Sequence, residues 1–115
     1  MNKMDNFEMQ ITLSPKLANP AVALKRHGDT LTINGEALDF SGLPAGATLP
    51  AGATGSDHII GPVERDDAGK LHLTVRFPIG YHAGESARFP APITVTKDGP
   101  IHLPDPGHEP KGASA

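Results

Sequence analysis

Glycine and proline interrupt this chain so often that helices of ordinary length have almost no room to form. There are 13 Gly and 12 Pro among the 115 residues, and residues 1–14 are the only stretch of ten or more that contains neither. An isolated helix needs about 12–15 residues to be stable, and a proline in its interior breaks it. Apolar and polar side chains alternate from Phe7 to Leu13, which is the period of a half-buried strand. The sequence therefore predicts an all-β fold.

Seven further segments resemble short strands: Ala21–Lys25, Thr30–Ile33, Glu36–Phe40, His58–Arg65, Lys70–Phe77, Pro92–Thr96 and Ile101–Leu103. Lys70–Phe77 is the clearest, because its strict alternation leaves one face buried and the other wet. Gly61 and Pro62 interrupt His58–Arg65, which favours an edge strand or a bulge there. We expect an antiparallel meander of about seven or eight short strands, which forms a small sandwich or a partly open barrel.

The strands predict a single β domain over residues 7–104. Residues 105–115 contain no large apolar side chain, so we expect a disordered C-terminal tail. Leu, Ile, Val and Phe make up about a fifth of the chain, close to the level of roughly 20% below which chains tend to stay disordered. Small domains with so little core usually gain stability from disulfides, metals or association. The chain has no cysteine, so we expect a homo-oligomer or a place in a larger assembly.

Asn34-Gly35 is the strongest hairpin signal in the sequence, because both residue types tolerate the positive φ of a type I′ turn. A two-residue loop there pairs Ile33 with Glu36. It also puts the apolar residues of both arms on one face: Leu31, Ile33, Leu38 and Phe40. The register and the apolar pattern agree.

Asp98-Gly99 predicts a second hairpin. A two-residue loop would set Val95 opposite His102 and turn the neighbouring apolar residues to the wrong face. A three-residue loop over residues 98–100 pairs Val95 with Leu103 and restores a common apolar side. We therefore predict the three-residue loop.

Two long connections remain. The first contains the hexapeptide Leu-Pro-Ala-Gly-Ala-Thr twice in tandem, at residues 43–48 and 49–54. A hexapeptide solenoid needs at least three repeats to bury a core, so we interpret this segment as an exposed, extended loop. The second connection, residues 78–88, carries Tyr81, His82, Glu85 and Arg88 and is the candidate interaction loop.

Charge and composition argue against several classes of function. The formal net charge is -3 and the basic residues are scattered, whereas nucleic-acid binding needs a concentrated basic surface. No apolar run approaches the roughly 18 residues of a membrane span, and residues 1–10 lack the apolar stretch of a signal peptide. The absence of cysteine fits a reducing compartment, so we expect a cytoplasmic protein. With no Trp and one Tyr, the chain also lacks the aromatic platforms typical of sugar-binding sandwiches.

The six histidines form no pair with the spacing of metal ligands on one strand or helix. Only His72 and His102, which lie in separate predicted strands, merit a test as a pair. The two would be expected to be solvated side chains, and we predict no metal site and no cofactor.

The acidic residues and hydroxyls show no catalytic arrangement either. Asp57, Glu64, Asp66 and Asp67 could supply a carboxylate pair, but Asp66-Asp67-Ala68-Gly69 is explained by turn formation between two strands. Ser56-Asp57-His58 are consecutive, so on a strand they point to opposite faces and cannot relay a proton. No Gly-x-Ser-x-Gly turn and no phosphate-binding loop is present. We therefore predict no catalytic residues and a protein that is not an enzyme.

Several segments resemble a group of small, uncharacterised proteins of tailed bacteriophages and prophages. The segments are 29–40, Leu43-Pro44, 46–50, 63–65, 70–74, 89–93 and 98–100, and the resemblance extends over about residues 22–104. The second hexapeptide copy departs from the pattern, because relatives carry a more varied segment there.

The resemblance implies a gene among or beside tail and tail-fibre genes, and a protein of the bacterial host cytoplasm or the virion. It also implies a tail-module accessory protein, either a minor structural component or an assembly factor, that acts through protein-protein contacts. The alternative is a β-sandwich binding module for a host or surface ligand, with residues 78–88 as its contact loop.

Overall fold

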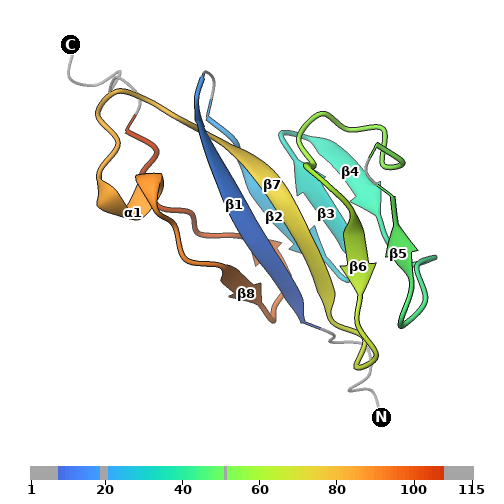
Figure 1. Ribbon diagram of the computed structural model, residues 1–115. Helices are drawn as coiled ribbons and strands as arrows, with labels where there is room; N and C mark the ends of the chain where they lie inside the picture. The colour runs from blue at the N-terminus through green and yellow to red at the C-terminus, as the bar shows by residue number, and fades with distance from the viewer. Residues whose placement is uncertain (1–7, 19–20, 51, 108–115) are drawn as a thin grey trace.

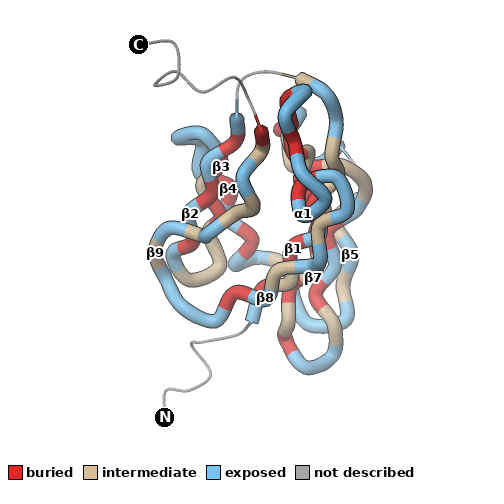
Figure 2. Tube along the Cα trace, turned by 90° about the vertical axis from the view of Figure 1, so that its left-hand side faces the viewer, coloured by how far each residue is buried: buried red, intermediate tan, exposed pale blue. Residues whose placement is uncertain are grey.

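The strands of this chain form two sheets, which pack against each other as the two layers of a sandwich (Figures 1 and 2). The structure is a computed structural model and describes residues 8–18, 21–50 and 52–107. Buried side chains from both sheets form a single apolar cluster between the layers. The all-β prediction is confirmed, and of the two predicted architectures the chain adopts the sandwich.

The first sheet has five strands in the order β5-β6-β7-β1-β8. These are β5 (Thr48–Leu49), β6 (Val63–Arg65), β7 (Leu71–Ile79), β1 (Met9–Leu17) and β8 (Ile93–Val95). The two nine-residue strands β1 and β7 lie side by side at its centre (Figure 1). Leu71, Leu73, Val75 and Phe77 are buried as the alternation predicts, and polar residues of β7 face outward.

The second sheet has four strands in the order β4-β3-β2-β9. These are β4 (Glu36–Asp39), β3 (Thr30–Ile33), β2 (Leu24–His27) and β9 (Gly99–Pro100). The type I′ turn at its β3–β4 hairpin is confirmed, because Asn34 and Gly35 have φ values of 50° and 89°. Ile33 pairs with Glu36, as predicted. The apolar residues of both arms are buried on one face: Leu31, Ile33, Leu38 and Phe40.

The strand order departs from a simple meander. Met9 pairs with Leu71 and Leu17 with Ile79 in a parallel ladder, so the first sheet is mixed. After β1 the chain forms β2, β3 and β4 in the other sheet. It then returns to the first sheet with β5 and β6, which precede β7. An antiparallel meander would keep successive strands adjacent, and that part of the prediction is wrong.

The predicted hairpin at residues 98–100 is also wrong. Val95 pairs with Met9 in the first sheet, whereas Gly99 pairs with Arg26 in the second, so the chain crosses between the sheets at this point. Asp98 stabilises the crossing, since its Oδ1 accepts a hydrogen bond from the amide of Gly28 at 2.9 Å. Residues 101–103 form no strand, although the amide of Ile101 donates to the carbonyl of Leu24 at 2.9 Å.

The predicted strand over residues 58–65 is interrupted, as Gly61 and Pro62 indicate. Ile59 forms an isolated antiparallel bridge with Val75, and β6 begins only at Val63. Gly61 has a φ of 75°, which lets the chain bulge between these two pairings.

The two hexapeptide copies repeat one backbone hydrogen bond. In each copy the amide of the second alanine donates to the carbonyl of the proline (Ala47 to Pro44, 3.1 Å; Ala53 to Pro50, 3.0 Å). The first copy is also tied to β6, because Gly46 donates to the carbonyl of Arg65 at 2.7 Å and Arg65 donates to that of Ala47 at 3.0 Å. The segment is mostly exposed, as predicted, but it also contributes the short edge strand β5.

The C-terminal segment is ordered further than predicted. The carbonyls of Pro106 and Gly107 accept hydrogen bonds from the amides of Gly80 and His82, at 2.8 Å and 3.0 Å. A Cβ on Gly107 would lie 2.2 Å from the amide nitrogen of Ala83, so the two backbones are in close contact. Residues 105–107, which we refer to as the C-terminal strap, therefore belong to the folded domain. The rest of the predicted tail lies outside the described residues.

Candidate functional site

Large apolar side chains are exposed at three positions among the described residues. Leu17 is 51% exposed, Tyr81 is 82% exposed and Phe89 is 78% exposed. Leu17 ends β1, and Tyr81 follows the end of β7, the parallel neighbour of β1. The parallel pairing thus brings two of the three side chains to the same end of the sandwich.

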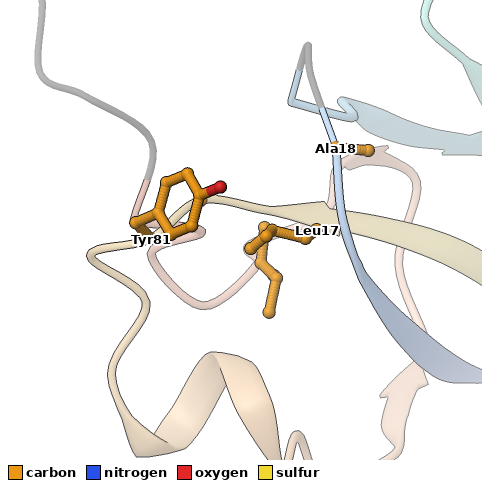
Figure 3. Close-up of a pocket in the computed structure, with 5 residues that line it drawn as sticks. Leu17, Ala18 and Tyr81 are labelled. Atoms are coloured by element: carbon orange, nitrogen blue, oxygen red, sulfur yellow. The ribbon is translucent and has the colours of Figure 1, made fainter.

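Leu17 and Tyr81 line a shallow pocket of about 220 Å³ together with Ala18, Ile79 and Gly80. Figure 3 shows the ring of Tyr81 beside the side chain of Leu17 at this pocket. The amide of Ala18 donates to the carbonyl of Ile79 at 3.1 Å, which holds the two strand ends together. We call these five residues the end patch. None of the five carries a charged side chain.

The backbone on both sides of Tyr81 is fixed. The amides of Gly80 and His82 donate to the C-terminal strap, and the amide of Ala83 donates to the carbonyl of Gly80 at 3.2 Å. The main chain on both sides of Tyr81 is thus hydrogen-bonded to the strap, while Tyr81 itself is 82% exposed. An exposed aromatic ring on a fixed backbone loses little conformational entropy when it is buried by a partner.

The predicted interaction residues all lie on the exposed segment after β7. Tyr81 and His82 belong to the turn, while Glu85 and Arg88 lie on the single-turn helix α1 (Glu85–Arg88). Nε of Arg88 donates to the carbonyl of Ala83 at 2.9 Å, so this side chain stabilises the loop as well as facing solvent. Tyr81 is the only one of the four in the end patch.

Sequence reasoning missed Leu17 and the strap. Leu17 is in phase with Met9, Ile11 and Leu13, so alternation places it on the buried face. It is exposed because it lies at the very end of β1. The strap has no strand-like pattern, and its contact with Ala83 depends on Gly107 having no side chain.

The shortest contact between titratable side chains in the described part of the chain belongs to a turn. Oδ1 of Asp66 accepts hydrogen bonds from the amides of Ala68 and Lys70, and its Oδ2 lies 3.0 Å from Nε2 of His72. The hydrogen bond with His72 is the main cause that lowers the pKa of the Asp66 carboxyl, followed by that with the Lys70 amide. The turn interpretation of Asp66-Asp67-Ala68-Gly69 is confirmed, since Gly69 also donates to the carbonyl of Asp66 at 3.0 Å.

The structure does not bring the histidine pair together. His72 lies on β7 in the first sheet, while His102 follows β9 of the second sheet and is exposed. Within the described ranges, no group of three or more His, Cys, Asp or Glu side chains could hold a metal ion. Ser56 is buried, and its Oγ accepts a hydrogen bond from the backbone amide of His58 at 3.2 Å.

No family model, curated protein or solved structure matches this chain. In the part of the chain that the structure describes, no helix has the length and apolar character needed to cross a membrane.

Proposed function

We propose that this chain is a protein-contact module without catalytic activity, and that the end patch is where a partner protein binds. The observation that carries the proposal is that Tyr81 is 82% exposed while both of its neighbours are hydrogen-bonded to the C-terminal strap. Buried aromatic anchors supply much of the binding energy in protein interfaces, and tyrosine is prominent among them. The adjoining apolar side chain of Leu17 would be covered in the same contact.

Together with the sequence resemblance, this surface supports a role as a tail-module accessory protein. Such a protein would be either a minor component of the virion or an assembly factor of the host cytoplasm. The thin core supports association with other proteins, because burial of the end patch would add apolar area that the isolated domain does not bury. The alternative, a module for a host or surface ligand, would bind through residues 78–88, which include Tyr81 of the end patch.

The proposal can be tested by incorporating a photoreactive phenylalanine analogue in place of Tyr81 in cells that produce the phage. Irradiation is expected to attach a tail protein, which mass spectrometry of the adduct identifies. Phe89 is the matched control, because it is an equally exposed aromatic residue outside the pocket. The analogue at Phe89 should give little of that adduct.

A second measurement distinguishes a structural component of the virion from an assembly factor. Mass spectrometry of purified virions should find the chain if it is a structural component, and find none if it acts only in assembly. Attachment of a host envelope protein at Tyr81, with no tail protein, would favour the ligand-binding module. Equal adducts from both positions, or none at Tyr81, would show that the end patch is not the contact site.

A further inference from the structure

The tip of the β3–β4 hairpin exposes an asparagine followed by a glycine. Asn34 and Gly35 are both exposed, and a Cβ on Gly35 would have no heavy atom within 4 Å. Glycine leaves its own amide nitrogen open to approach, because it has no side chain to shield that atom. The dipeptide that forms this turn therefore also has the two groups that react in asparagine deamidation.

We propose that Asn34 is a site of spontaneous deamidation, which the closed hairpin suppresses and the open hairpin permits. In this reaction the amide nitrogen of Gly35 attacks Cγ of Asn34 and forms a five-membered imide. The Cγ–Nδ2 bond breaks, and the leaving nitrogen takes the proton from the attacking amide and departs as ammonia. One water molecule then opens the imide, with hydroxyl added to one carbonyl carbon and a proton to the ring nitrogen. The products are aspartate or isoaspartate, and water is the only co-reactant.

Two hydrogen bonds to one residue hold Asn34 away from this reaction. Oδ1 of Asn34 accepts from the amide of Ala23 at 2.8 Å, and the amide of Asn34 donates to the carbonyl of Ala23 at 3.0 Å. Ala23 lies just before β2, so these bonds direct the carboxamide toward the neighbouring strand of the sheet. Attack requires Cγ to swing toward the nitrogen of Gly35. The contacts with Ala23 must therefore open before the imide can form.

The two products have different consequences for the fold. Aspartate retains a side-chain oxygen that can accept the hydrogen bond from Ala23. Isoaspartate routes the main chain through the side-chain carbons, so the turn gains one backbone atom. The two-residue turn that pairs Ile33 with Glu36 and Leu31 with Leu38 then no longer fits. Molecules that form isoaspartate cannot close this hairpin in its native register. The modification therefore accumulates irreversibly in molecules whose hairpin has opened.

The first test compares the folded protein with the protein in concentrated urea, at the same mildly alkaline pH. Peptide mapping by mass spectrometry follows the exchange of NH for O at each asparagine. We expect Asn34 to react about tenfold or more faster in urea, as the loss of two hydrogen bonds suggests. Asn19 precedes Pro20, which has no amide hydrogen, and serves as the internal control. Equal rates in both conditions, or no reaction at Asn34 in urea, would overturn the proposal.

The second test follows the opening step itself. Urea at concentrations below the unfolding transition should raise the hydrogen-exchange rate of the Ala23 amide and the deamidation rate of Asn34 by the same factor, because both require these contacts to open. Deamidation that stays constant while Ala23 exchange accelerates would show that these contacts do not control it. Separation of the two products tests the consequence. The isoaspartate form should melt at a lower temperature than the Asn34→Asp variant, and equal melting would contradict the loss of register.

Discussion

Nη2 of Arg65 lies 3.5 Å from Oδ2 of Asp29, which joins β6 of the first sheet to the turn between β2 and β3 of the second. The same guanidinium donates to three backbone carbonyls: those of Leu43 at 2.5 Å, Phe40 at 2.9 Å and Gly69 at 2.9 Å. Arg65 is only 5% exposed, so these bonds compensate for burying its charge. This side chain links the ends of several loops at one end of the sandwich.

Arg65→Lys should therefore lower the free energy of unfolding by about 2–4 kcal/mol. Lysine keeps the charge, but a single ammonium cannot reproduce the planar array of donors that reaches three carbonyls. Urea denaturation followed by circular dichroism measures the change. Arg76→Lys, on the outer face of β7, is the control and should change the free energy by less than about 0.5 kcal/mol. Equal effects of the two substitutions would show that the buried network contributes little.

The C-terminal strap gives a prediction that separates steric contact from backbone strain. Gly107→Ala places a Cβ 2.2 Å from the amide nitrogen of Ala83, at a φ of 73°. Gly55→Ala imposes the same strain at a φ of 75°, but a Cβ there meets nothing within 4 Å. A non-glycine residue in this backbone region costs about 1–2 kcal/mol, so Gly55→Ala should lose about that much stability, and Gly107→Ala should lose more because its Cβ also clashes with the backbone of Ala83.

Only Gly107→Ala should also displace the strap. The amides of Gly80 and His82 would lose their acceptors, and their hydrogen-exchange rates should rise above those in Gly55→Ala. Similar exchange at these two amides in both variants would indicate that the strap does not hold the Tyr81 backbone.

Local patterns in the sequence predict those parts of the fold that neighbouring residues decide. Asn34 and Gly35 specify their own turn, and the alternation of β7 specifies which of its faces is buried. The pairing of β1 with β7 is different, because Met9 and Leu71 are far apart along the chain. Alternation has the same period whether a neighbouring strand is parallel or antiparallel, so it cannot distinguish the two.

The candidate site was only partly predictable, because local patterns in the sequence do not show which strands pair. Tyr81 stands out as the single tyrosine in a long connection, but its partner Leu17 has the phase of a core residue. The two meet only because β1 and β7 end side by side. After Val95 the sequence predicted a hairpin, whereas the chain crosses from the first sheet to the second. A hairpin and a crossing both need a turn at Asp98-Gly99, so the turn signal does not distinguish them.

The lowered pKa of Asp66 predicts an acid-sensitive contribution to stability. The unfolded carboxyl has its ordinary value of 3.8 and the folded carboxyl a lower one, because the fold stabilises the charged form through His72 and the Lys70 amide. The contribution is therefore fully present above about pH 3.8 and is lost as the pH falls through the lower folded value. Since Asp66 is accessible to solvent, we expect a small effect.

Urea denaturation of the native chain and of Asp66→Asn across this range measures the contribution. The two chains should differ near neutral pH and converge in acid. Asp57→Asn, at an exposed loop position, controls for the loss of one surface carboxylate and should change the free energy of unfolding little. A difference for Asp66→Asn that persists unchanged to low pH would mean that the carboxylate charge is not its source.

Deletion of one copy of the tandem hexapeptide tests what the second copy contributes to stability. Removal of residues 49–54 gives the same chain as removal of residues 43–48, because the two copies are identical. The remaining copy retains every group that the first copy presents to Arg65. Gly55 then takes the position of Leu49, which pairs with Val63 and packs against the core. The shortened chain should fold with a loss of about 1–2 kcal/mol, the usual cost of losing a partly buried leucine.

The substitution Leu49→Gly in the full-length chain is the matched control for this deletion. Both variants place a glycine opposite Val63, but only the deletion shortens the connection from β5 to the bridge at Ile59. Equal losses in the free energy of unfolding, measured with urea, would show that the second copy contributes its leucine and little else. A loss several kcal/mol larger for the deletion would instead show that its length is needed for Ile59 to reach Val75, because a taut connection would pull that pairing apart.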